Sequence, residues 1–394
     1  MLLTADVEFI ISRLSENGHR ADVVGGPVRD WLRGFAPADY DITTSATPEE
    51  IKAAFSGFRT VDTGIKHGTV TLILNKVPYE ITTYRIDGDY LDSRHPETVS
   101  FTQNITEDLA RRDFTVNAIA YNPKFGITDP FGGREDIEKK IIRAVGDPHR
   151  RFSEDALRIL RALRFSSTLG FGIEAKTAEA LREKSRLLSN ISAERIYTEW
   201  KKLLSGGFAY SVIRDFSEVI SVFIPELREL KLPKEKDFAA DFITRQAQLF
   251  YLTLGEGSAY AADIAIRRLK TDSLTRDVTV KMLENVGKYR LSTLFDAGKM
   301  LIDLDVNVAE ALVGLEISLG NFAAQSKELL KEYIASGLPY KTCQLAIDGN
   351  DIKALGISGK EIGKTLSSLL SLVASSELEN KKETLIECIK HQKM

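Results

Sequence analysis

Two aspartates separated by one residue, Asp39 and Asp41, follow a glycine-rich turn in this chain. The run Asp39-Tyr40-Asp41-Ile42 has the pattern of a strand, in which residues i and i+2 point to the same face. Two carboxylates on one face can bind a pair of Mg²⁺ ions, which clamp the attacking and leaving oxygens of a phosphoryl displacement. A solvated turn is the alternative for an isolated Asp-x-Asp sequence, and the preceding glycine turn favours the metal site.

That turn is Gly25-Gly26-Pro27-Val28-Arg29-Asp30. Asp22-Val23-Val24 is predicted to end a strand before it, and residues 28–33 are predicted to begin a helix after it. Gly25 and Gly26 allow bare backbone N–H groups and a helix N-terminus to approach a ligand closely. The sequence therefore predicts a triphosphate-binding turn beside the two aspartates.

The composition describes a globular protein of two to four domains, with 394 residues, 28% charged and 43% hydrophobic. No apolar run approaches the roughly 18 residues of a membrane span. The first six residues lack the basic start and apolar core of a signal peptide. The two cysteines, Cys343 and Cys388, are far apart and have no metal-ligand spacing, which favours a reducing cytoplasm.

Charge is unevenly distributed along the chain. The net charge is −3, yet Arg111 to Lys202 contains 19 Lys and Arg against 13 Asp and Glu, a net +6. A basic middle between acidic ends is expected of a protein that grips a phosphate backbone at one place. A solvated charged surface is the alternative that charge alone leaves open.

Strand patterns are confined to the first third of the chain. Residues 70–74 and 79–84 flank Asn75-Lys76 and are predicted to form a hairpin. Thr47 and Pro48 are predicted to cap and open a helix. After Ile137 the pattern is helical, with helices expected at 153–166, 176–188 and 192–204, and more to the C-terminus.

Four motifs in order resemble one family, the class II tRNA nucleotidyltransferases and bacterial poly(A) polymerases of the polymerase-β-type nucleotidyltransferase superfamily. The first motif is the glycine turn with Asp39-Tyr40-Asp41. The others are Arg111-Arg112-Asp113-Phe114-Thr115-Val116-Asn117-Ala118, Asp129-Pro130-Phe131-Gly132-Gly133 and the run from Arg151 to Arg161. The segments 345–352 and 378–383 resemble the tRNA-facing tail of that family more weakly.

The resemblance implies an α+β fold, with an N-terminal mixed α/β nucleotidyltransferase head at 1–137. An all-α neck at 138–204, body at 205–325 and tail at 326–394 would follow it. It also implies a two-metal Mg²⁺ site, CTP and ATP as substrates, and the acceptor and T arms of tRNA as partner. Neither a membrane nor an obligatory protein partner is expected.

The resemblance also assigns site residues. Glu80, in a Glu-x-Thr-Thr-x-Arg context, would join the acidic cluster of Asp39 and Asp41, although a lone strand glutamate is usually solvent-facing. Arg29 and Arg112 would bind the triphosphate, because a guanidinium presents paired donors to phosphate oxygens. Asp113 and Asn117 are four residues apart and would share a helix face if this run is helical, with Asn117 near the ribose or a phosphate.

Asp155 and Arg158 are expected to read the base. At i and i+3 of a helix they would project together, and an ordinary intrahelical salt bridge is the alternative. Cytosine and adenine each present an amino donor beside a ring-nitrogen acceptor, which a carboxylate and a guanidinium complement. Uracil and guanine present a carbonyl and an N–H there and would be refused. Arg161 and Arg164 extend the basic side of this helix and would stack on or support the base.

Several activities within the family remain open from the sequence. The polar segment 86–100 is predicted to be a mobile loop, and the resemblance implies that such a loop switches the pocket from C to A, which favours full CCA addition. An A-only enzyme, a CC-only enzyme and a poly(A) polymerase are the alternatives, the last expected to have a longer basic C-terminal extension. A non-catalytic RNA-binding protein is the alternative of another class.

Overall fold

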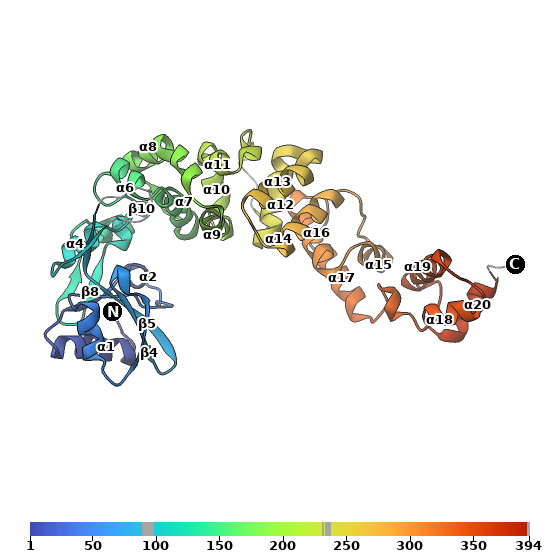
Figure 1. The fold of residues 1–394 in the computed structure, drawn as a ribbon. Helices are drawn as coiled ribbons and strands as arrows, with labels where there is room; N and C mark the ends of the chain where they lie inside the picture. Colours follow the sequence, from blue (N-terminus) through green and yellow to red (C-terminus); the bar gives the residue numbers. More distant parts are fainter. Residues whose placement is uncertain (89–97, 231, 233–237, 392–394) are drawn as a thin grey trace. The chain divides into compact units, whose positions relative to one another are not determined.

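The computed structural model describes residues 1–88, 98–230, 232 and 238–391. Its elements form two compact units, Met1–Arg228 and Glu229–Met394, and Figure 1 shows their order along the chain. In the described part of the chain, no helix is both long and apolar enough to cross a membrane. The loop predicted at 86–100 falls largely on residues 89–97, which lie outside the described residues.

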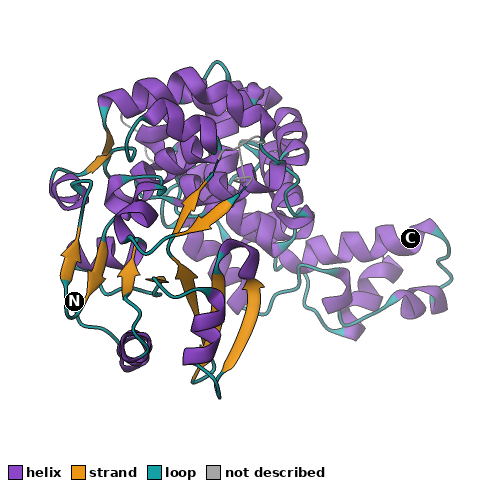
Figure 2. Ribbon diagram, turned by 60° about the vertical axis from the view of Figure 1, so that its left-hand side comes forward, coloured by secondary structure: helices purple, strands orange, loops and turns teal. Residues whose placement is uncertain are grey.

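A seven-stranded mixed sheet, ordered β3-β4-β5-β2-β1-β8-β9, underlies the first unit (Figure 2). Its strands are β1 (Ala21–Val24), β2 (Ile42–Thr44), β3 (Arg59–Gly64), β4 (Thr69–Leu74), β5 (Val77–Thr83), β8 (Ala120–Asn122) and β9 (Gly126–Thr128). The predicted hairpin is confirmed as β4–β5, where Asn75 and Lys76 both adopt the positive φ that a tight two-residue turn requires.

The register of β2 against β5 places the acidic residues side by side. These two strands are parallel, with Ile42 opposite Ile81. Asp41 and Glu80 each directly precede one of these paired residues, so they lie side by side where β2 begins, between two interior strands of the sheet. The glutamate on the predicted hairpin therefore approaches the Asp-x-Asp sequence only through a pairing between distant segments.

Helices cover this sheet and begin where local signals place them. They are α1 (Ala5–Glu16), α2 (Gly26–Leu32), α3 (Pro48–Ala54), α4 (Ile105–Ala110) and α5 (Gly133–Glu138). Helix α3 starts as predicted: the Thr47 side chain accepts the Glu50 N–H, and the Glu50 carboxylate accepts the Thr47 N–H. A small antiparallel pair, β6 (Arg85–Asp87) with β7 (Val99–Phe101), precedes α4.

The rest of the first unit is mainly helical. Its helices are α6 (Pro148–Glu154), α7 (Leu157–Leu169), α8 (Ala175–Lys184), α9 (Ala193–Ser205), α10 (Ala209–Asp215) and α11 (Ser217–Phe223). The expectation of helices alone after Ile137 is wrong in one detail, because β10 (Ile141–Ile142) pairs with β11 (Gly172–Ile173) in parallel. The helix expected at 176–188 ends at Lys184 and continues as a 3₁₀ turn, Ser185–Asn190.

The continuous helix predicted at 153–166 is also wrong. Helix α6 ends at Glu154, Asp155 is extended with φ −141°, and α7 begins at Leu157. The Asp155 carboxylate accepts the Leu157 N–H at 3.1 Å. A short acidic side chain that bonds the backbone two residues on competes with helix formation, which explains the break.

A buried cluster lies where the sheet meets α4 and the segment that follows it. It contains Val24, Tyr84, Ile105, Leu109, Ala118, Ala120 and Val145. Within this layer the Tyr84 hydroxyl donates to the buried carboxylate of Asp22, which also accepts hydrogen bonds from Nε and Nη2 of Arg20. These bonds fix the middle of β1, which ends directly before Gly25.

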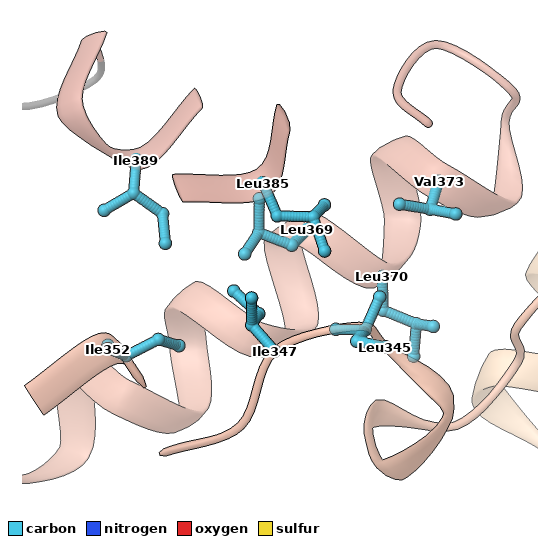
Figure 3. Close-up of a cluster of buried hydrophobic side chains, with 8 residues drawn as sticks. All are labelled: Leu345, Ile347, Ile352, Leu369, Leu370, Val373, Leu385 and Ile389. Atoms are coloured by element: carbon cyan, nitrogen blue, oxygen red, sulfur yellow. The ribbon is translucent and has the colours of Figure 1, made fainter. Parts of the chain in front are cut away.

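The second unit is built of helices. They are α12 (Phe242–Leu254), α13 (Ser258–Arg268), α14 (Ser273–Asn285), α15 (Leu294–Asp303), α16 (Val306–Leu319), α17 (Ser326–Ala335), α18 (Gly349–Ala354), α19 (Lys360–Ala374) and α20 (Lys382–His391). The last three enclose their own apolar cluster (Figure 3). Leu369, Leu370 and Val373 share one face of α19 there, at helical spacing.

The expected α+β class, with a mixed sheet first and helices after it, is confirmed. The structure divides the chain once, between Arg228 and Glu229. The four-part division with boundaries at 137, 204 and 325 stays a prediction.

Candidate active site

One cavity of about 530 Å³ in the first unit gathers twelve of the thirteen predicted site residues. They are Gly25, Gly26, Arg29, Asp39, Asp41, Arg112, Asp113, Asn117, Asp155, Arg158, Arg161 and Arg164. Glu80 does not line it. The wall also includes six residues that were not predicted: Pro27, Asp30, Arg111, Leu157, Phe165 and Arg195.

The glycine turn forms one edge of this cavity. Gly25 has φ 79° and ψ −128°, a backbone conformation that residues other than glycine rarely adopt. A Cβ atom at Gly25 would lie 3.1 Å from Nη1 of Arg112. Glycine is therefore required here because it adopts this positive φ without strain and because it leaves room for the Arg112 guanidinium.

Gly25→Ala is expected to lower the free energy of unfolding by about 1–3 kcal/mol and to weaken nucleotide binding, because it strains the turn and displaces Arg112. Thermal unfolding and a nucleotide titration measure the two effects. Gly18→Ala is the matched control, since Gly18 has φ 86° but open space around it. Equal nucleotide affinity in both variants would show that the approach to Arg112 is unimportant.

The two aspartates lie just before a strand and not within one, so the prediction of a strand through both is wrong. Strand β2 begins at Ile42. The Asp41 carbonyl accepts the Val24 N–H at 3.0 Å, which anchors this residue beside β1. The aspartates are thus fixed by the adjoining strand although they precede it.

The acidic residues influence one another. Partial enclosure by protein raises the pKa of Asp41, Arg112 opposes this, and the charges of Asp39 and Glu80 raise the pKa further, so that it lies above its usual range. Glu80 therefore lies close enough to act on the Asp41 carboxylate even though it is outside the cavity wall. Three carboxylates that repel one another form a site that favours a cation.

The donor set fits Mg²⁺, which prefers carboxylate oxygens. Among the described residues, no group of three Asp, Glu, His or Cys side chains is arranged to hold a metal ion by itself. Mg²⁺ is commonly held by one or two carboxylates, with waters and substrate phosphates completing its shell. The acidic residues here suit that mode of binding.

Arg112 faces the acidic residues from the segment after α4. Enclosure by protein lowers the pKa of the Arg112 guanidinium, although the negative charge of Asp108 acts to raise it. Asp108 is fully buried, 2.8 Å from Nη2 of Arg111 and 3.7 Å from Nη2 of Arg112, and its carboxylate accepts the Thr43 hydroxyl. Asp108 thereby ties the arginine pair to β2. Sequence reasoning missed it, although it lies three and four residues before the arginines.

The helix considered for Arg111 to Asn117 does not form. Arg111 follows the last residue of α4, and only Thr115–Asn117 makes a 3₁₀ turn. Asp113 and Asn117 still meet, because the Asn117 amide donates to the Asp113 carboxylate at 3.1 Å. Arg29 Nη1 donates to the Asn117 side-chain oxygen at 2.7 Å, and Arg161 Nε donates to Asp113 at 2.7 Å.

Asp113 is the electrostatic anchor of this group. Burial raises its pKa, but the charges of Arg161 and Arg158 and the bond from Asn117 outweigh burial and lower the pKa to about 2. Because its folded pKa lies below its usual 3.8, Asp113 stabilises the fold above pH 4. That contribution is lost as the pH falls toward 2.

Asp113→Asn is expected to remove about 2 kcal/mol of unfolding free energy at pH 7 and to flatten the loss of stability between pH 4 and pH 2. Urea unfolding of the full chain at several pH values measures this. Asp62→Asn, at an exposed carboxylate paired with Lys52, is the control. If Asp113→Asn and the wild type lose stability in parallel as the pH falls, the role of Asp113 is refuted.

The two predicted base-reading residues line the cavity, but they are not paired with each other. Asp155 lies 3.4 Å from Nη2 of Arg195 on α9. Arg158 ion-pairs with Glu154 at 2.8 Å and donates to the carbonyls of Arg151 and Arg111. The salt bridge that was the alternative interpretation is therefore absent. No spacing signal connects Arg195 to Asp155, which explains why it was missed.

Phe165 supports three of the cavity's arginines. The guanidinium carbons of Arg164, Arg29 and Arg161 lie 4.0, 5.3 and 5.4 Å from the centre of its ring. Enclosure lowers the pKa of Arg164, whose Nε lies 2.8 Å from Glu199. Arg161 and Arg164 of α7 thus both contact an aromatic ring and lie within 4.0 Å of the buried Glu199 carboxylate.

The third sequence motif is structural. The Asp129 carboxylate accepts the N–H groups of Gly133 and Arg134 at 2.7 and 2.9 Å. A Cβ at Gly133 would lie 2.2 Å from the Thr115 carbonyl oxygen. The motif therefore starts α5 and packs it against the turn that carries Asn117.

Comparison with known proteins agrees with this geometry. Residues 21–143 match the poly A polymerase head domain, and residues 170–230 match the probable RNA and SrmB-binding site of polymerase A. The chain is 38% identical over 389 residues to the CCA-adding enzyme of Lactobacillus helveticus (strain DPC 4571), covering 95% of this chain and 94% of that one. The chain belongs to the CCA-adding enzymes. A second relative, the CCA-adding enzyme of Enterococcus faecalis (strain ATCC 700802 / V583), is 38% identical over 98% of this chain and 95% of its own.

Solved structures of CCA-adding enzymes share the fold. That of Bacillus stearothermophilus in complex with CTP superposes with a TM-score of 0.83 at 30% identity, over 99% of this chain and 98% of its own. The CCA-adding enzyme of Thermotoga maritima, solved in complex with tRNA, superposes with a TM-score of 0.68 over 99% of this chain and 96% of its own. At 21% sequence identity this match shows a shared fold alone. The resemblance drawn from the four motifs is confirmed.

Proposed function

We propose that this chain adds C, C and A to the 3′ end of tRNA, using CTP and ATP and releasing pyrophosphate. One observation carries the proposal: a single cavity joins the Asp39 and Asp41 carboxylates, an arginine-rich wall and the Asp155 and Arg158 side chains. Membership of the CCA-adding enzymes supports it, as does the likeness to a relative solved with CTP.

Asp39 and Asp41 would hold Mg²⁺, with Glu80 adding negative charge beside them. When bound, the metal ions neutralise phosphate charge and activate the attacking and leaving oxygens. Arg112 and Arg29, with the backbone of Gly25 and Gly26, hold the triphosphate. The α-phosphate is then positioned for in-line attack by the RNA 3′-hydroxyl.

Asp155 and Arg158 choose the base. The carboxylate accepts the amino group of cytosine or adenine, and the guanidinium donates to the adjacent ring nitrogen. Uracil and guanine would place an oxygen against Asp155 and an N–H against Arg158, leaving buried polar groups unpaired. A protein pair of this kind selects C and A without a nucleic-acid template.

The basic region from Arg111 to Lys202 would attract the tRNA acceptor arm, and the helices beyond it would hold the remainder of the acceptor and T arms. Both cysteines are free thiols. Free thiols are suited to a reducing compartment, and we assign the activity to the cytoplasm.

Three tRNA transcripts, ending at the discriminator base, at C and at CC, test the proposal. Each is incubated with protein, Mg²⁺ and CTP, ATP or both, and the 3′ ends are sequenced. Ends in CCA on all three transcripts are expected when both nucleotides are present. Addition of A alone to the CC end, addition of C alone, or long A tails would each replace the proposal by that partial or polymerising activity. No extension would favour a binding protein.

A further inference from the structure

An exposed aromatic ring lies close in sequence to the Asp39 and Asp41 carboxylates. Phe35 follows α2 and is 58% exposed. Its N–H donates to the Asp30 carbonyl, which fixes its backbone against the helix. Phe35 precedes Asp39 by four residues, so their Cα atoms are at most about 14 Å apart. This distance is about the length of two or three nucleotides of RNA, so a strand that ends at the acidic cluster can reach the Phe35 ring.

The ring rests on a cation that is itself held firmly. The Arg33 guanidinium lies 5.0 Å from the centre of the Phe35 ring and 5.5 Å from that of the nearly buried Phe171. Arg33 also ion-pairs at 3.2 Å with Asp30, which lines the active-site cavity. One side of the Phe35 ring is therefore supported, and much of the rest is open to solvent.

We propose that Phe35, supported by Arg33, is a stacking platform for an unpaired nucleotide near the 3′ end of the RNA primer. Unpaired bases stack on exposed aromatic rings, and a neighbouring guanidinium strengthens such contacts and suits the RNA phosphates. The primer strand must enter the cavity with its 3′-hydroxyl at the acidic cluster, which brings its last nucleotides within reach of this ring. This inference rests on the proposed function.

The chain offers a closely matched control. Phe125 is 57% exposed, and the Arg20 guanidinium lies 5.0 Å from its ring centre. Like Phe35 it does not line the active-site cavity, but it stands in the turn between β8 and β9, beside Arg20 and so at the end of β1 opposite Gly25. Phe125→Ala removes the same kind of ring and cation contact at the far end of β1 from the glycine turn.

The test compares Phe35→Ala, Phe35→Trp and Phe125→Ala on an RNA that ends in CC. For Phe35→Ala we expect KM for the RNA to rise about tenfold, equivalent to about 1.4 kcal/mol, with KM for ATP unchanged. Phe35→Trp should keep the wild-type KM, because it retains a stacking face, and so should Phe125→Ala.

A second readout reports stacking directly. With 2-aminopurine at the last or penultimate nucleotide, fluorescence should be quenched on binding to wild type and to Phe35→Trp, and much less on binding to Phe35→Ala. If Phe35→Ala leaves the KM for RNA unchanged, or raises the KM for ATP by the same factor, the stacking role of Phe35 is refuted. The proposed function would still stand in that case, provided that the wild type adds nucleotides. Absence of addition by the wild type would instead refute the function.

Discussion

Replacing Asp41 with alanine is expected to slow nucleotide addition by at least about 10³-fold, with tRNA affinity nearly unchanged. Metal ions supply several kcal/mol of charge stabilisation in phosphoryl transfer, and each 1.36 kcal/mol is a factor of ten in rate. Asp41 lines the cavity together with Asp39, and partial enclosure raises its pKa, with the charges of Asp39 and Glu80 raising it further. The same loss is expected for Asp39→Ala.

Single-turnover addition of A to a CC-ended tRNA, with protein and ATP in excess, measures the chemical step. Asp62→Ala, at an exposed carboxylate of the same unit paired with Lys52, should keep the wild-type rate. A smaller loss is expected for Glu80→Gln, since Glu80 lies outside the cavity wall. A rate within tenfold of wild type for Asp41→Ala would exclude this residue from the catalytic cluster.

The second large effect concerns the choice of nucleotide. Arg158→Ala is expected to reduce the preference for CTP over UTP by about 10²-fold, because a site built to hydrogen-bond one base edge discriminates by leaving polar groups unpaired with the wrong base. Glu154 and two main-chain carbonyls fix the Arg158 guanidinium at the cavity wall.

The ratio of kcat/KM for CTP and UTP measures this preference. Arg150→Ala is the matched control, since Arg150 also ion-pairs with Glu154, at 3.0 Å, but its side chain is 77% exposed and lies outside the cavity. A uniform fall in rate with both nucleotides for Arg158→Ala, and no change in their ratio, would assign Arg158 a structural role only.

Contacts between residues close in sequence were largely predictable. The β4–β5 hairpin, the Thr47 cap and the glycine turn each depend on a few adjacent residues whose backbone preferences are strong. The exceptions are also local. At Asp155, bonding of the side chain to the Leu157 N–H outweighs helix periodicity. At Asp39 and Asp41 the predicted strand does not form, and β2 begins only at Ile42.

The types of residue in the site, and their order along the chain, were determined by the sequence by itself. Only the tertiary structure decided which of them meet. Glu80 reaches Asp41 through the parallel pairing of β2 with β5, Arg195 reaches Asp155 across forty residues, and three arginines converge on Phe165. Spacing along a helix or strand specifies neighbours within a few residues. Contacts between distant segments arise only when sheet register and helix packing bring those segments together.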